Sequence, residues 1–383
     1  MSKTSSLDDS IAIMEGRRLL GVGLALLLLA AVGSGIWYSN SSLKREHAAA
    51  ASASEAISTR GLVGSEKEEF FADPRVVTAF ARQGITVRIE KAGSRLIAHG
   101  YDPKRYDFGF PSGAPAAAEL KAAAKASETY VPFYTPIVFA SWKPIAEILV
   151  ANGLAERRPG DYFVTDLSRL LQLVEQRARW RDLKSSAAFA TNKAVLVNST
   201  DVRTSNSAAM YLSLASYVLN GQSVVSSQDE VDAVLPKVAD LFVRQGFQET
   251  SSAAPFEDYL ALGMGKTPLL VAYESQLVSF WLTHPDRPRG DMVMIYPVPT
   301  VYSKHVVVPY TPEGRRVGEA LATNPELQSL AHEFGFRTGG DTRGPEVWAK
   351  RGIVVPEPLS DVVDPPSHEW LERMIAGIEQ RFR

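Results

Sequence analysis

Residues 61–66 read Gly-Leu-Val-Gly-Ser-Glu, a short apolar stretch that turns small and polar where a helix over about residues 67–83 is predicted to begin. Three other stretches have the same form. They are residues 92–95 (Ala-Gly-Ser-Arg), 110–113 (Phe-Pro-Ser-Gly) and 200–207 (Thr-Asp-Val-Arg-Thr-Ser-Asn-Ser). Strands are expected at 85–90 and 106–110, and helices at 114–127 and 205–220. This alternation of strands and helices predicts an α/β fold.

The length and order of these elements predict two lobes. A chain of 383 residues is too long for one core of ordinary size. Two long apolar runs, predicted as strands at 130–141 and 269–282, bracket a helix-rich block. We therefore expect the chain to cross twice between the lobes, with 61–137 and 277–383 in lobe 1 and 138–276 in lobe 2. A further strand at 292–297, a helix at 311–334 broken near Asn324, an irregular tail at 339–366 and a last helix at 367–382 complete the prediction.

The N-terminal region predicts a membrane anchor. Residues 19–38 carry no charge, and a helix of that length matches the hydrocarbon thickness of a bilayer. Arg17 and Arg18 precede the run and Trp37 and Tyr38 end it, which favours a cytoplasmic tail at 1–18 and an extracytoplasmic remainder. Residues 39–60 are small and polar at first and are expected to be a spacer. The alternative is a signal peptide that is cleaved.

The four strand-to-helix stretches are also the candidate binding site. A helix start offers free N–H groups and a positive dipole end, and ligands of open α/β sheets gather at the carboxyl ends of the strands. Glu66 is expected to repel an anion, and Glu274 is expected to accept a hydrogen bond from a ligand that carries a donor. The candidate ligand-binding residues are Ser65, Glu66, Ser94, Ser112, Arg203, Ser205, Asn206, Ser207 and Glu274.

Each of these residues also has a structural interpretation. The serines and Asn206 are suited to N-capping, Glu66 to stabilising its helix, Arg203 to a solvated surface, and Glu274 to a salt bridge at a hinge or between lobes.

Composition and motifs argue against several other functions. The chain has no cysteine, which excludes disulfides, a thiolate nucleophile and Cys-ligated metal. Its net charge of -2 gives no reason to expect a nucleic-acid partner. Gly265-Lys266-Thr267 lacks the first glycine of a phosphate-binding loop, and the six histidines have no metal-ligand spacing. We therefore expect no enzyme activity, no cofactor and no metal.

The folded part resembles the type II periplasmic solute-binding proteins, which include the phosphate-, sulfate- and molybdate-binding proteins. The resembling segments are residues 61–66, 92–94, 106–112 and 203–207, together with the strand containing Pro132, Tyr134 and Pro136. The resemblance implies a two-lobed fold in which serine hydroxyls and backbone N–H groups surround a small ligand.

With the anchor, the resemblance also implies a single-pass protein of the bacterial inner membrane that captures a small anionic or zwitterionic solute for an ABC-type permease. The alternative function is a sensor or assembly subunit that binds a membrane protein.

Overall fold

The computed structural model describes residues 56–160, 162–246, 248–286, 290–339, 343–359 and 361–382. The predicted cytoplasmic tail, the anchor and residues 39–55 of the predicted spacer lie outside these residues. No helix in the described ranges is both long and apolar enough to cross a bilayer. Residues Ile57–Arg383 form one compact unit.

A mixed sheet runs through this unit. Its strand order is β2-β1-β3-β9-β4-β8-β6-β5, with β7 and β10 also paired to β4 and β11 to β9. The sheet begins at Ile57, which pairs with Ile85, so the last residues of the predicted spacer belong to β1. The strands are β1 (Ile57–Val63), β2 (Ile85–Lys91), β3 (Phe108–Phe110), β4 (Tyr130–Trp142), β5 (Ala155–Arg158), β6 (Tyr162–Asp166), β7 (Leu269–Tyr273), β8 (Met292–Val298), β9 (Thr300–Pro309), β10 (Arg337–Thr338) and β11 (Val362–Val363).

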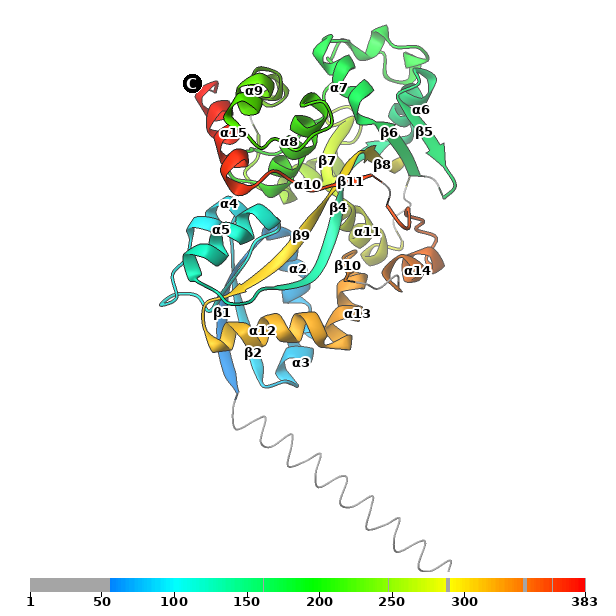
Figure 1. Ribbon diagram of the computed structural model, residues 1–383. Helices are drawn as coiled ribbons and strands as arrows, with labels where there is room; N and C mark the ends of the chain where they lie inside the picture. The colour runs from blue at the N-terminus through cyan, green and yellow to red at the C-terminus, as the bar shows by residue number, and fades with distance from the viewer. Residues whose placement is uncertain are drawn as a thin grey trace, which may run out of the picture. The chain divides into compact units, whose positions relative to one another are not determined.

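Two long antiparallel strands, β4 and β9, connect two separate sets of apolar clusters. Phe133 of β4 and Val307 of β9 belong to one cluster, whereas Phe139 and Val301 of the same strands belong to another. Figure 1 shows β4 and β9 side by side between the two groups of elements. Each group has its own core, so the compact unit consists of two lobes joined by these strands.

The first lobe is built on β1, β2 and β3. Its clusters combine these strands with apolar residues from the surrounding helices, among them Phe70, Phe80 and Leu321. The helices are α2 (Glu68–Ala72), α3 (Pro74–Ala81), α4 (Ser94–His99), α5 (Ala114–Ala124), α12 (Pro312–Thr323) and α13 (Pro325–Glu333), with the 3₁₀ turn η1 (Ser65–Lys67) before α2.

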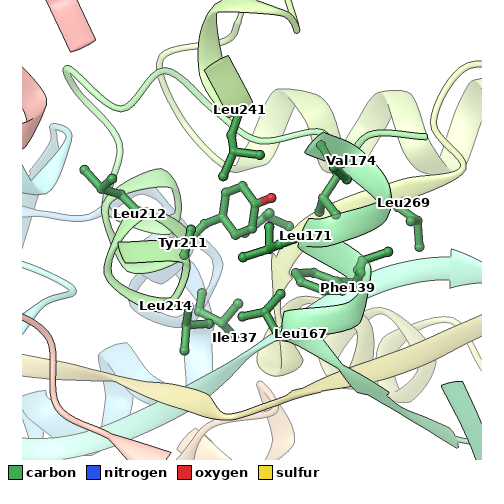
Figure 2. Packing of buried hydrophobic residues seen from close by; sticks show 14 of the residues in the cluster. Ile137, Phe139, Leu167, Leu171, Val174, Tyr211, Leu212, Leu214, Leu241 and Leu269 are labelled. Carbon is green, nitrogen blue, oxygen red and sulfur yellow. The ribbon is translucent and has the colours of Figure 1, made fainter. Parts of the chain in front are cut away.

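The second lobe holds the largest apolar cluster. Figure 2 shows the fully buried Tyr211 with the side chains of Phe139, Leu171 and Leu241 around it. The helices of this lobe are α6 (Lys143–Ala151), α7 (Leu167–Glu175), α8 (Asn206–Leu219), α9 (Gln228–Val243), α10 (Ala253–Leu262), α11 (Glu274–Thr283), α14 (Arg343–Lys350) and α15 (His368–Gln380).

Several predicted elements differ from the structure. The run at 269–282 is not one strand, because β7 ends at Tyr273 and α11 begins at Glu274. The second strand that links the lobes is instead β9, which was not predicted. The helix expected over 67–83 is divided at Asp73, which caps α3. The break expected near Asn324 is confirmed, because Asn324 caps α13.

The C-terminal segment packs with the second lobe. Met374 and Ile378 of α15 lie in the cluster of Phe139, and Trp348 of α14 packs in the cluster of Leu270. The lobe boundaries predicted from the sequence stay a prediction as a whole, but α15, which was assigned to lobe 1 as part of 277–383, contributes to the core of the second lobe.

Candidate functional site

Each of the four predicted stretches lies where a strand or loop meets a helix start. Gly64, Gly93 and Gly113 are the N-cap residues of η1, α4 and α5, and Ser205 is the N-cap of α8. None of these four N-cap positions has a capping bond from its own side chain. The hydroxyl of Ser205 contacts that of Ser207 at 3.1 Å. N-capping therefore does not explain Ser205, and the hydroxyls of Ser94 and Ser112 also bond to groups outside their own helix start.

Five of the predicted residues meet at one cavity between the lobes. Ser65, Glu66 and Ser94 line it from the first lobe, and Ser205 and Asn206 line it from the second. The remaining lining residues are Gly64, Ala92, Gly93, Thr250, Ser251, Ser252 and Tyr273. The cavity measures about 10 Å³, which is close to the space that one water requires. In this conformation the lobes are closed on each other.

Asn206 ties the lobes together at the floor of the cavity. Its side-chain amide donates to the backbone carbonyl of Ser112 at 2.9 Å and lies 3.0 Å from the Tyr273 hydroxyl. Ser94 Oγ accepts from the Ser112 N–H at 2.9 Å, so the 92–95 and 110–113 stretches are also linked. Ser303 of β9 completes the network, since its hydroxyl donates to the same carbonyl of Ser112.

A buried lysine lies directly behind this floor. Lys67 Nζ donates to Glu66 Oε1, to Ser112 Oγ at 2.9 Å and to His305 Nδ1 at 3.1 Å, and the Lys67 side chain is fully buried. The Ser112 hydroxyl donates to the same Glu66 oxygen. Three acceptors thus use the three N–H bonds of the ammonium group.

The charge states of Glu66 and His305 are set by burial and by the neighbouring Lys67. Burial raises the pKa of the Glu66 carboxyl, but the Lys67 charge and the hydrogen bonds from Lys67 and Ser112 outweigh it and lower the pKa from 4.5 to about 2. Burial and the Lys67 charge lower the pKa of His305 well below its usual range. Glu66 is therefore ionised and His305 neutral at pH 7, with Nδ1 of His305 as the acceptor.

The lobes approach each other closely at two glycines. A Cβ on Gly93 would lie 2.2 Å from the backbone oxygen of Thr204, and one on Gly113 would lie 2.1 Å from Asn206 Oδ1. Arg95 of α4 adds an ion pair with Glu372 of α15 at 2.7 Å and donates to the Arg203 carbonyl at 3.2 Å. Closure of the lobes therefore requires glycine at these two positions, as well as the polar contacts.

A larger pocket adjoins the cavity and shares Ser65 and Glu66 with it. It has a volume of about 280 Å³ and lies between η1 and α2 of the first lobe and α10 and α11 of the second. Its lining is acidic and aromatic, with Glu66, Glu68, Glu69, Glu257, Phe256, Phe280, His284 and Phe334 among the residues. The interlobe space is therefore negative on this side.

The other four predicted residues do not line either space. Ser112 is fully buried behind the floor of the cavity. Ser207 is buried within its lobe and contacts Thr200 Oγ1 at 2.8 Å. Arg203 forms a bidentate pair with Asp201 and stacks over Phe382. Glu274 is fully buried and accepts from Arg337 at 2.7 and 2.8 Å and from the Tyr296 hydroxyl at 2.6 Å. The contacts of Glu274 match its structural interpretation, a salt bridge near the hinge.

Sequence reasoning missed the groups that hold the site together, namely Lys67, His305, Tyr273 and Ser303. Lys67 stands among Glu66, Glu68 and Glu69, a pattern typical of a solvated helix face. His305 and Ser303 lie on β9, which was not predicted. The one available signal was the composition of residues 300–308, which are rich in the β-branched residues valine and threonine and include a tyrosine, as strands often are.

A cavity of about 1080 Å³ lies elsewhere. Residues of the β5–β6 hairpin, the β8–β9 turn and the segments 356–359 and 361–363 line it. Four of its charged side chains form two ion pairs, Arg158 with Glu156 at 2.8 Å and Arg169 with Asp166 at 3.3 Å. We place the candidate site at the interlobe cavity because polar groups from both lobes converge there.

Comparison with known proteins bears on the fold. No protein-family model matches the sequence, and no curated protein matches it. Among solved structures, the chain is similar to a Bordetella parapertussis protein described as an extracellular solute-binding protein, with TM-score 0.52, 11% identity, and 85% of this chain and 98% of that chain covered.

Two further structures have comparable similarity. Iron-bound HitA from Pseudomonas aeruginosa gives TM-score 0.51 and 10% identity over 85% of this chain and 99% of its own. An ABC transporter solute-binding protein from Thermotoga lettingae, bound with alpha-D-tagatose, gives TM-score 0.50 and 13% identity over 85% of this chain and 93% of its own. Together with two cores joined by β4 and β9, these similarities show that the chain has the fold of the type II periplasmic solute-binding proteins.

Proposed function

We propose that this chain is an extracytoplasmic solute-binding protein that encloses a small solute between its two lobes. The observation that carries the proposal is the convergence of helix starts from both lobes, with Ser65 and Ser94 on one side and Ser205 and Asn206 on the other, on one cavity. A solute requires more room than this cavity offers. It would enter when the lobes open about β4 and β9, and it would extend into the adjoining pocket.

The charges favour a solute that presents hydrogen-bond donors. Glu66 is ionised at the cavity wall, and Glu69 and Glu257 line the adjoining pocket with Phe256 and Phe280. A protonated amine gains from these carboxylates and from the aromatic faces. A zwitterion or amine therefore suits the site better than a simple anion, and Ser65, Ser94, Ser205 and Asn206 would bind its neutral polar groups.

A binding screen tests this function. Thermal unfolding of the full chain in detergent is measured against amino acids, amines, sugars and oxyanions. We expect a solute with an amino group to raise the Tm. The Asn206→Ala variant should bind it roughly tenfold to a hundredfold more weakly, because a lost hydrogen bond to a charged ligand costs about 1.5–3 kcal/mol. The matched control is Asn192→Ala, at an exposed asparagine, which should bind like the wild type. Equal binding by both variants would place the solute elsewhere.

One observation favours a second function, that of a sensor or assembly subunit. The polar groups at the floor of the cavity bond to one another, and the space left is that of about one water. Such an interface can hold the lobes closed as a rigid surface for a membrane-protein partner. In that case no solute in the screen raises the Tm and a membrane protein co-purifies. Genes for a permease and an ATPase beside this one would favour the transport function.

The proposed location of the protein rests on the sequence of residues 1–38. We propose that residues 19–38 anchor the chain in the inner membrane with the folded part outside, where an ABC-type permease would be its partner. Alkaline phosphatase fused after Arg383 should then be fully active, and a cytoplasmic reporter at the same position inactive. The opposite pattern would contradict the orientation, and a mature N-terminus between about residues 35 and 55 would show cleavage of a signal peptide.

A further inference from the structure

The contacts of Lys67 are those of an anion-binding site. Its ammonium group is fully buried and points at one carboxylate oxygen, Glu66 Oε1. The Ser112 hydroxyl donates to the same oxygen, and the Ser112 N–H is held by Ser94 Oγ at 2.9 Å. The ring of Phe110 lies 4.7 Å from the ammonium and closes its apolar side. A buried cation and a positioned hydroxyl that converge on one oxygen form the kind of site that binds a small oxyanion.

The oxyanion in this site belongs to the chain itself. Glu66 is the immediate neighbour of Lys67 in η1, and its side chain is 6% exposed at the wall of the interlobe cavity. A free anion that entered the cavity would meet a lysine that is already neutralised and a carboxylate of its own charge. The cavity, of about 10 Å³, has no room for a free anion beside the Glu66 carboxylate.

We propose that Glu66 is a built-in occupant of an oxyanion site made by Lys67 and Ser112, and that it excludes free oxyanions from the cleft. This inference rests on the proposed interlobe binding site and deepens it, because it makes Glu66 the residue that decides ligand charge. The simpler interpretation is a structural ion pair with no capacity for another anion. The two differ in what happens once the Glu66 carboxylate is removed.

The test is chemical rescue of Glu66→Ala in the full chain in detergent. Sodium formate and sodium acetate are the probes, since they restore the carboxylate that the substitution removes, and sodium chloride at equal ionic strength is the reference. We expect Glu66→Ala to unfold at a lower temperature than the wild type in chloride. Formate should raise the Tm of Glu66→Ala until the site is saturated. At a formate concentration ten times the apparent Kd, the ratio of folded to unfolded protein should be about tenfold higher than without formate. The wild type should gain nothing beyond the chloride effect.

Three variants make the result specific. Glu66→Gln keeps the side chain in place, so formate should not rescue it. Glu66→Ala/Lys67→Met removes the cation as well and should also show no rescue. Glu326→Ala, at an exposed carboxylate of α13 that pairs with Arg82, should respond to formate like the wild type. If Glu66→Ala is unfolded in chloride, circular dichroism during the same titration measures the recovery of structure.

The inference is overturned if formate and acetate stabilise Glu66→Ala no more than chloride does. It is also overturned if the double variant gains as much as the single one, or if the wild type binds the probes equally well. None of these measurements uses the natural solute. Failure here would leave solute binding by the wild type intact, and failure of the solute screen would leave the rescue intact.

Discussion

Replacing Glu274 by alanine is expected to lower the free energy of unfolding by about 3–5 kcal/mol, because it leaves a buried arginine without its main partner. Arg337 is 2% exposed and donates to both oxygens of Glu274, at 2.7 and 2.8 Å. Tyr296 donates to the same carboxylate at 2.6 Å and would lose its acceptor too. The measurement is urea unfolding of the full chain in detergent, followed by circular dichroism.

Two controls separate the buried pair from ion pairs in general. Arg82→Ala removes an ion pair with Glu326 whose side chains are 66% and 44% exposed, and it should cost about 0.2–1 kcal/mol. Glu274→Met/Arg337→Met removes both buried charges and should recover much of the loss. A cost for Glu274→Ala no larger than that of Arg82→Ala would show that the pair contributes little at this position.

Adding one methyl group at Gly93 is expected to shift the lobes toward an open form. The backbone of Gly93 has φ -65° and ψ 149°, which alanine adopts readily, so the first lobe itself should tolerate the change. The conflict is with the Thr204 carbonyl of the other lobe, 2.2 Å from the added Cβ. Overpacking of this kind costs about 1–3 kcal/mol, which lowers the ratio of closed to open molecules by roughly fivefold to more than a hundredfold.

Small-angle X-ray scattering measures this shift as a larger radius of gyration for Gly93→Ala than for the wild type. The matched control is Gly265→Ala, since a Cβ there would meet nothing within 4 Å. Gly93→Ala should also weaken the binding of any solute that is enclosed by closure. An unchanged radius of gyration together with unchanged binding would mean that the two lobes do not separate at this contact.

The local parts of the fold could be predicted from the sequence, and the long-range parts could not. The turn at Ser65 and the break at Asn324 depend on neighbouring residues and were placed correctly. The run at 269–282 contains a buried strand followed by a buried helix. The residues of β7 are buried, and so are Leu277 and Val278 of α11, so both parts of the run carry apolar residues. A continuous apolar run does not distinguish a buried strand from a buried helix.

The candidate site also has a part that local sequence predicts and a part that depends on distant residues. Ser65, Ser94, Ser205 and Asn206 belong to a recognisable pattern of strand, small polar residues and helix, and the structure brings them to one cavity. The burial of Lys67 depends on His305, 238 residues further along the chain, through the pairing of β9 with β4 and β3. The partner of Glu274 is Arg337, on a two-residue strand that follows α13. No local pattern contains either pairing.

Native mass spectrometry of the full chain, purified from its own membranes in mild detergent, tests the central claim most directly. If the lobes enclose a solute, the wild type should carry one additional small molecule. That molecule should be lost from Asn206→Ala and retained by Asn192→Ala. A protein that shows only its own mass, or an added mass that both variants retain, would contradict binding of a solute between the lobes.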